Sequence, residues 1–201
     1  MSNNKAKPGR IFVVSGPSGS GKTTLLRTVR LKKEFRDNLV KIITATTRKP
    51  RDGERNGKDY QFLDREDFLK RLQNGEFIES QQIYGDYYAT PEKELSAMIA
   101  TGRDALLCVD VKGALAIKHI FARDSVLIFI KVADIKSLRQ RLHLRSSESK
   151  DSLEKRLKIA KEEMSYAKNY DYIIMNDELK NAIRELSAII IAERLKVAKT
   201  G

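Results

Sequence analysis

The sequence has a single cysteine and no long apolar run, and each absence narrows the class of protein. With only Cys108 in 201 residues no intrachain disulfide framework can form, which fits a reducing compartment and predicts a cytoplasmic protein. No window approaches the ~18 apolar residues that a membrane-spanning helix needs, so no membrane partner is expected. Residues 1–9, MSNNKAKPG, lack the apolar core of a signal peptide and are predicted to form a disordered tail. The chain has room for one or two domains with a substantial core.

The signature of a nucleic-acid-binding module is also missing, although the formal net charge is +12. Lysine and arginine are spread along the chain, without the interleaved aromatic residues of an RNA-binding motif. A positive field also favours a protein that handles two polyanionic nucleotides. We therefore expect small nucleotides as partners and no nucleic acid, and the sequence leaves the oligomeric state open.

The clearest motif present is VVSGPSGSGKTTLL, residues 13–26, which matches G-x-x-x-x-G-K-[ST] from Gly16 to Thr23. An apolar run at 11–14 suits a buried strand, and helical spacing follows at 24–31. The glycines allow successive N–H groups to form an anion-binding nest at a helix N-terminus. In such a loop Lys22 can reach the β- and γ-phosphates, and the Thr23 hydroxyl can bind Mg²⁺.

The motif predicts a loop that binds a nucleoside triphosphate but leaves GTPase, ATPase and kinase open. A glycine-rich turn that binds nothing is the structural alternative. The residues of the loop predicted to bind the triphosphate, which in an ATP-dependent enzyme is that of ATP, are Gly16, Pro17, Ser18, Gly19, Ser20, Gly21, Lys22, Thr23 and Thr24.

Strand and helix patterns alternate along most of the chain, which predicts an α/β fold with a parallel sheet covered by helices on both faces. The expected strands are 11–14, 39–47, 105–109, 125–132 and 170–175, and the expected helices are 24–31, 112–121, 135–144, 153–168 and 179–196. Short strands at 59–63, 77–83 and 86–89, with helices at 64–72 and 91–102, break this rhythm. They predict a small mixed or antiparallel insertion, placed above the strand ends where phosphates bind.

Two segments of this insertion indicate an acceptor site for an anion. TATTRKPRDGERNGKDY, residues 44–60, contains Arg48 and Arg51, and arginine binds phosphate oxygens bidentately while remaining charged. A solvated basic loop is the alternative. FIESQQIYGDYYATP, residues 77–91, places Glu79 in a stretch otherwise poor in charge and ends with Tyr88 and Thr90.

Taken together, these motifs resemble the guanylate kinase family over nearly the whole length. The matching patterns are G-P-S-G-x-G-K-[ST], T-T-R-x-P-R-x-G-E-x-[NH]-G-x-x-Y, F-[IL]-E, G-x-Y-Y and a final acidic-asparagine element. The resemblance implies a P-loop nucleoside monophosphate kinase fold with a helical lid. Its implied parts are a core of 10–43, 91–134 and 170–201, a GMP-binding subdomain of 44–90, and a lid with flanking helices at 135–169. The implied activity is ATP-dependent phosphorylation of GMP, and of dGMP, to the diphosphate in purine nucleotide metabolism, by direct in-line transfer with Mg²⁺.

The resemblance also implies roles for individual residues. Those expected to bind the GMP phosphate are Arg48, Arg51, Tyr60 and Tyr88, and those expected to line the guanine pocket are Thr44, Glu79 and Thr90. Asp110 would contact GMP or order a Mg²⁺-bound water, and Asn176 and Asp177 would contact the adenine of ATP. A helix N-cap is the competing role for the last two. The expected catalytic charges are Lys22, Arg48 and the lid residues Arg145 and Arg156.

The chemistry of Glu79 agrees with this assignment. An ionised carboxylate only accepts hydrogen bonds, and guanine presents adjacent N1–H and N2–H donors, whereas adenine has an acceptor at N1. One departure from the family pattern is Cys108, which stands where an acidic residue is usual and which we expect to be a buried small residue. Three other functions stay open: a scaffold that binds phosphorylated proteins, a kinase for a phosphorylated sugar, and a GTPase.

Overall fold

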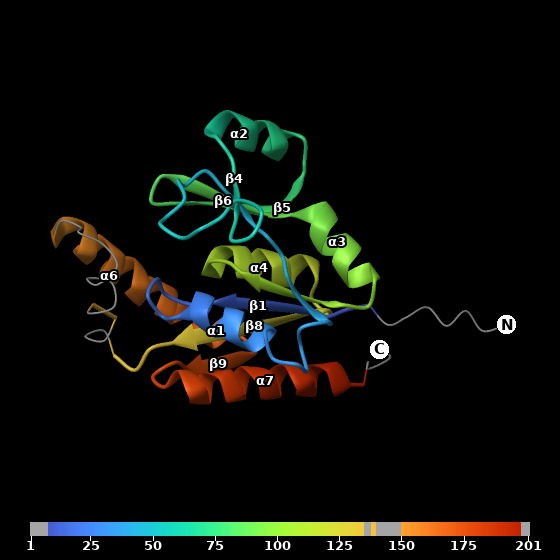
Figure 1. The fold of residues 1–201 in the computed structure, drawn as a ribbon. Coiled ribbons are helices and arrows are strands. Elements are labelled where there is room, and N and C mark those ends of the chain that lie inside the picture. The colour runs from blue at the N-terminus through green and yellow to red at the C-terminus, as the bar shows by residue number, and fades with distance from the viewer. Residues whose placement is uncertain (1–7, 135–137, 140–149, 198–201) are drawn as a thin grey trace. The chain divides into compact units, whose positions relative to one another are not determined.

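The computed structural model describes residues 8–134, 138–139 and 150–197, and it confirms the predicted α/β class (Figure 1). A five-stranded sheet has the order β2-β7-β1-β8-β9. Its strands are β1 Ile11–Ser15, β2 Leu39–Lys41, β7 Asp104–Cys108, β8 Ser125–Lys131 and β9 Tyr172–Met175. The β2–β7 and β8–β9 pairs are parallel, as expected for strands joined through helices.

The described helices lie between these strands in the chain, except the last, which follows β9. They are α1 Lys22–Arg30, α3 Glu92–Ala100, α4 Val111–Ile120, α6 Lys150–Ser165 and α7 Leu179–Leu195, and a short 3₁₀ turn at Tyr166–Asn169 continues α6. The predicted helix 135–144 lies outside the described residues apart from 138–139. Among the helices that the structure describes, none is long and apolar enough to cross a bilayer.

A second, four-stranded sheet forms the insertion and has the order β4-β3-β6-β5. Its strands are β3 Ala45–Thr46, β4 Gln61–Phe62, β5 Phe77–Ile83 and β6 Asp86–Pro91. The β3–β4 pair is parallel, while β3–β6 and β5–β6 are antiparallel, so the prediction of a mixed insertion is confirmed.

Helix α2, Arg65–Gln73, covers this small sheet, and its sequence explains why. The Asp64 side chain accepts a hydrogen bond from the backbone N–H of Asp67 and caps the helix N-terminus. Phe68 is fully buried and stacks against Phe77 and Tyr87, with ring centroids 5.0 and 5.4 Å away. Burial of one such aromatic side chain stabilises the insertion by roughly 2–3 kcal/mol.

The chain divides into two compact units. The first contains the residues up to Ile11 together with Asn38–Leu107 and Lys112–Ser125, and it includes the whole small sheet. The second contains Phe12–Asp37, Cys108–Val111 and the residues from Val126 onward. Within the second unit, α7 packs against α1 and against β9 (Figure 1).

Two expectations need correction. The predicted single strand 39–47 is two strands, β2 and β3, which belong to different sheets. The backbone N–H of Ile42 still bonds to Leu106 beside β2, but the carbonyl of Thr44 already accepts from Gln61 beside β4. A continuous β-favouring run does not reveal this change of partner. At the N-terminus, Gly9 of the predicted tail donates a backbone hydrogen bond to Ile99.

Candidate active site

The phosphate loop lies in the second unit, between β1 and α1. Gly16, Gly19 and Gly21 have positive φ values of 140°, 87° and 86°, a region that residues with a side chain rarely adopt. A Cβ atom at Gly16 would also collide with the carbonyl of Ile130, and one at Gly21 with the side-chain amide of Asn176. The glycines are therefore required both by the backbone turn and by the neighbouring chain.

The loop directs positive charge to the start of α1. Lys22 is half-buried, and its Nζ donates to the carbonyl oxygens of Gly16 at 2.6 Å and Pro17 at 3.0 Å. Thr23 and Thr24 are exposed in the first turn, which contains no acidic side chain. The positive end of the helix dipole and the N–H groups of this turn therefore suit an anion.

Asn176 fastens the loop to the end of β9. Its side-chain amide donates to the carbonyl of Ser20 at 2.7 Å, although 156 residues separate the two in the sequence. Asp177 accepts a hydrogen bond at Oδ1 from the backbone N–H of Ala133. The N-cap residue of α7 is Glu178, so the alternative N-cap role for Asn176 and Asp177 is wrong.

Asp110 follows β7, and its carbonyl accepts a 3.2 Å hydrogen bond from the Ser15 hydroxyl at the end of β1. Cys108 is half-buried and free of any disulfide, so the expectation of a fully buried residue is wrong. The reason is its position as the last residue of β7, where the strand leaves the core.

Helix α6 brings two further charges to the second unit. Arg156 is half-buried on its second turn, while the predicted partner Arg145 lies outside the described residues. Glu163, which the sequence analysis did not select, is also half-buried. Burial raises the pKa of Glu163 to about 7; the charge of Lys22 opposes this rise and the charge of Asp110 adds to it. In the sequence, Glu163 lies seven residues after Arg156, which is two helical turns and therefore the same face of the helix.

In the first unit, Glu79 and Thr90 form a buried polar pair. The two residues are directly opposite in the β5–β6 register, and the Thr90 hydroxyl donates to Glu79 Oε1 at 2.6 Å. Glu79 is 9% exposed and Thr90 is completely buried, so Glu79 is not an exposed edge-strand residue. Thr44 is buried as well, one residue before β3. A buried carboxylate of this kind needs hydrogen-bond donors, because an unpaired charge is costly.

Arg48, Tyr60 and Tyr88 lie together in the same unit. The guanidinium carbon of Arg48 is 5.4 Å from the centre of the Tyr60 ring, and the Tyr60 and Tyr88 rings meet edge-on at 6.3 Å. Burial by itself would lower the pKa of Arg48, but hydrogen bonds and charge from Glu54, with a contribution from Tyr88, raise it overall. The structure thus brings together three of the four residues predicted to hold the GMP phosphate.

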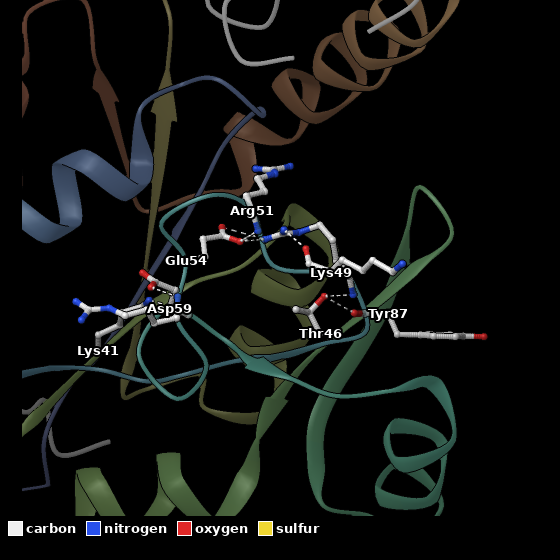
Figure 2. Close-up of polar contacts among 9 residues, drawn as sticks. Lys41, Thr46, Lys49, Arg51, Glu54, Asp59 and Tyr87 are labelled. Atoms are coloured by element: carbon white, nitrogen blue, oxygen red, sulfur yellow. Dashed lines mark hydrogen bonds and ion pairs between the residues drawn. The ribbon is translucent and has the colours of Figure 1, made fainter. Parts of the chain in front are cut away.

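Glu54, to which the sequence analysis assigned no role, organises this loop. Both of its carboxylate oxygens accept from Arg48 Nη2, at 3.0 and 2.9 Å, and Oε2 also accepts from the backbone N–H of Arg51 at 2.8 Å (Figure 2). The Arg51 side chain is exposed and extends away from this carboxylate (Figure 2). The signal was present in the sequence as the acidic residue three positions after Arg51.

The other tyrosines of the insertion, Tyr84 and Tyr87, have different surroundings. Tyr87 stacks on Phe68 in the core of the insertion. Tyr84 is 51% exposed in the turn between β5 and β6, with φ at 54°.

The residues present suit ATP and Mg²⁺. A Cβ atom on Gly16 or Gly21 would occupy space that the phosphate loop needs. The loop also carries the Lys22 ammonium and the Thr23 hydroxyl, which are the groups that a triphosphate with a metal ion requires. Within the described ranges no group of three or more histidine, cysteine or acidic side chains could hold a metal ion. Mg²⁺ at a nucleotide site needs no such cage, because phosphates and waters supply most of its ligands.

A phosphate loop would suit any enzyme of the P-loop class. An enzyme that only hydrolyses its nucleotide, however, needs neither the group formed by Arg48, Tyr60 and Tyr88 nor the buried Glu79–Thr90 pair. The class is therefore that of P-loop kinases, which transfer a phosphoryl group to a second, phosphorylated substrate. A family profile described as guanylate kinase matches residues 8–193. The chain belongs to the guanylate kinase family, whose members phosphorylate GMP to GDP with ATP as donor.

Individual relatives agree with this assignment. The chain is 38% identical over 194 residues to a guanylate kinase of Clostridium perfringens, a match that covers 96% of this chain and 88% of the relative. It is 40% identical over 188 residues to a guanylate kinase of Carboxydothermus hydrogenoformans, covering 94% and 90%. The crystal structure of guanylate kinase from Anaplasma phagocytophilum superposes with a TM-score of 0.80 at 34% identity, covering 95% of this chain and 89% of that one.

Proposed function

We propose that the phosphate loop, Gly16 to Thr24, binds the triphosphate of ATP, with Asn176 and Asp177 beside the adenine. Three features support this: the positive φ values of the glycines, the Lys22 ammonium at the loop, and the hydrogen bond from Asn176 to Ser20. Mg²⁺, when bound, would neutralise the phosphate charge, held by the Thr23 hydroxyl and, through water, by Asp110.

GMP, and dGMP with it, is proposed to bind in the first unit. The guanine would lie against Thr44, Glu79 and Thr90, and its phosphate against Arg48, Arg51, Tyr60 and Tyr88, with Asp110 as a further contact. The buried Glu79–Thr90 pair carries this proposal, because a buried carboxylate that only accepts hydrogen bonds matches the paired N–H donors of guanine.

The proposed reaction is direct in-line transfer without a covalent enzyme intermediate. The acceptor oxygen belongs to a phosphate that is already ionised, so the protein needs no general base. Lys22, Arg145 and Arg156 would stabilise the charge of the transferring group, while Arg48 would align the acceptor. A lid within 135–169 would exclude water, because hydrolysis of ATP is the competing reaction.

The division of the chain into parts belongs to the same proposal. We assign 10–43, 91–134 and 170–201 to the nucleotide-binding core and 44–90 to the GMP-binding subdomain. A cytoplasmic location agrees with the presence of a single cysteine, Cys108. Mononucleotides, and no nucleic acid, are the expected partners.

A coupled ADP-release assay across GMP, dGMP, AMP, UMP and ribose phosphates tests the proposed acceptor site. We expect turnover with GMP and dGMP, and a kcat/KM at least about a hundredfold lower with AMP, because its purine edge leaves the Glu79 carboxylate poorly paired. Comparable turnover of AMP would refute guanine recognition by Glu79. Turnover confined to ribose phosphates would instead support the sugar-phosphate alternative.

Replacing Arg48 with methionine is expected to raise the KM for GMP by about 10- to 100-fold with little change in the KM for ATP. The reason is the loss of charge-assisted hydrogen bonds to the phosphate, each worth about 1.5–3 kcal/mol. Arg55→Met on the same loop is the matched control, since Arg55 is exposed and its hydrogen bonds to Asp59 are made by its backbone N–H and carbonyl. Steady-state kinetics measure both constants. An unchanged KM for GMP in Arg48→Met would exclude Arg48 from the acceptor site.

A further inference from the structure

The turn formed by residues 51–54 places a carboxylate beside two arginines. The backbone N–H of Glu54 donates to the carbonyl of Arg51 at 3.0 Å, and Gly53 has a positive φ of 80°, which glycine adopts without steric cost. The Glu54 side chain closes the turn from the other side, because its Oε2 accepts from the backbone N–H of Arg51 at 2.8 Å. The position of the carboxylate is therefore set by its own turn.

The same carboxylate holds the guanidinium of Arg48. Both of its oxygens accept from Nη2, at 3.0 and 2.9 Å, in a hydrogen-bonded ion pair (Figure 2). The side chains of Arg48 and Glu54 are only 13% and 22% exposed, so solvent ions screen this pair less than they screen pairs on the surface. Because arginine stays charged, loss of the carboxylate would leave a largely covered cation without its counter-charge.

Uncharged groups also hold the Arg48 side chain. Its Nη1 donates to the carbonyl of Lys49 at 2.7 Å, and its guanidinium carbon lies 5.4 and 5.8 Å from the ring centres of Tyr60 and Phe62. A ring face attracts a cation without directing a particular N–H, whereas a carboxylate does direct one. The orientation of the guanidinium edge therefore depends strongly on Glu54.

The guanidinium can bind a phosphate while it is held in this way. Arginine has five N–H donors, so the three hydrogen bonds to Glu54 and Lys49 do not exhaust its capacity. The Arg51 side chain is exposed, while its backbone is bound to Glu54. One carboxylate thus fixes Arg48 through its side chain and Arg51 through its main chain, which limits the positions that the two cations can adopt.

We propose that Glu54 is a positioning residue for the acceptor phosphate: its carboxylate orients the Arg48 guanidinium and fixes the backbone of Arg51, so that both arginines meet the phosphate of GMP. The proposal rests on the proposed binding of that phosphate by Arg48 and Arg51. Glu54 is itself negatively charged, and it favours the phosphate only through the two arginines.

The charge of Glu54 makes the direction of the effect informative. A carboxylate beside an anion-binding site repels the anion, so removal of its charge would by itself strengthen GMP binding and lower the KM for GMP. If Glu54 positions the arginines, the same substitution raises this KM, because a cation that is free to move loses more entropy when it binds a phosphate. The two effects have opposite signs, and the measured KM decides between them.

The test compares Glu54→Gln with Asp52→Asn, which removes the same charge from an exposed position in the same turn. Glutamine keeps the size of the side chain, but its amide N–H₂ faces another donor, either Nη2 of Arg48 or the backbone N–H of Arg51. We expect Glu54→Gln to raise the KM for GMP about tenfold, to lower kcat less than about threefold and to leave the KM for ATP unchanged. Asp52→Asn should leave all three constants within about twofold of wild type.

Guanosine, which lacks the phosphate, separates positioning from general damage to the loop. Its inhibition constant as a competitor of GMP should stay within about twofold of wild type in Glu54→Gln, because only the phosphate meets the arginines. A double substitution shows whether Glu54 acts through Arg48. In an Arg48→Met background, the further change Glu54→Gln should alter the KM for GMP less than about threefold, because the guanidinium that it orients is already gone.

An unchanged or lower KM for GMP in Glu54→Gln would overturn the proposal, as would an equal rise of this KM in both backgrounds. Equal weakening of GMP and guanosine binding would do the same, since it indicates a loop that is disturbed as a whole. If Arg48→Met leaves the KM for GMP unchanged, the proposed acceptor site fails and the role of Glu54 fails with it. If Arg48→Met raises this KM and Glu54→Gln does not, only the inference about Glu54 fails.

Discussion

Substitution of Lys22 by alanine is expected to lower kcat for GMP phosphorylation at least about a thousandfold, a loss of about 4 kcal/mol of transition-state stabilisation. The ammonium is the positive side chain at the first turn of α1, where the loop carbonyls of Gly16 and Pro17 hold it in place. Charge on the γ-phosphoryl group spreads over its oxygens during transfer, and a positive charge oriented in advance stabilises this distribution. Single-turnover and steady-state measurements of ADP release give kcat for the variant and for the wild type.

Two further variants separate this effect from damage to the loop. Lys22→Met keeps most of the apolar stem and should show a similar loss of kcat. Lys33→Ala removes an exposed lysine just after α1 and should behave as wild type. Thermal unfolding reports whether the loss of hydrogen bonds to Gly16 and Pro17 disturbs the fold. Near-normal turnover in a folded Lys22→Ala protein would refute the role assigned to this residue.

Conversion of Glu79 to glutamine is expected to weaken GMP binding by about 100- to 1,000-fold while leaving ATP binding nearly unchanged. Glutamine keeps the size of the side chain and can still accept the hydrogen bond that Thr90 donates. Its amide N–H₂, however, faces a guanine edge that also presents donors, so one hydrogen bond is lost and two donors oppose each other. Titration calorimetry with each nucleotide separates the two affinities.

Glu92→Gln provides the matched control, because this carboxylate is exposed in the first turn of α3, just beyond β6. It removes the same charge near the same strand end and should leave GMP affinity within about twofold of wild type. Equal weakening of GMP and ATP binding in Glu79→Gln would point to a general loss of structure. Unchanged GMP binding would place guanine recognition elsewhere.

Much of the fold followed from local patterns. The strand predicted at 77–83 has the same bounds as β5, and the predicted strand 125–132 differs from β8 by one residue. The prediction for β8 is accurate because a run of consecutive buried apolar residues has few alternatives, while β5 is bounded by Gly75 and Gly85, which limit the length of the strand. The run 39–47 failed because its residues suit either sheet, and the partner strands, not the run itself, decide where β2 ends and β3 begins.

Only part of the candidate site could be predicted from the sequence. Residue types and motif spacing selected Arg48, Tyr60 and Tyr88, which the structure brings together. Glu54 was missed, since an acidic residue in a basic loop has many possible partners and only the folded loop shows that both its oxygens accept from Arg48.

By itself the sequence determined the phosphate loop. The backbone turns of that loop require glycine at fixed positions, and Lys22 provides the positive charge that phosphate binding requires. The sequence also determined the alternation of strands and helices, which depends on interactions between residues close in the chain. Only the tertiary structure decided that Asn176 fastens the loop at Ser20 and that Thr90 lies opposite Glu79. The first pair joins residues 156 apart in the chain, and the second depends on the register of β5 against β6, and no local periodicity encodes either of them.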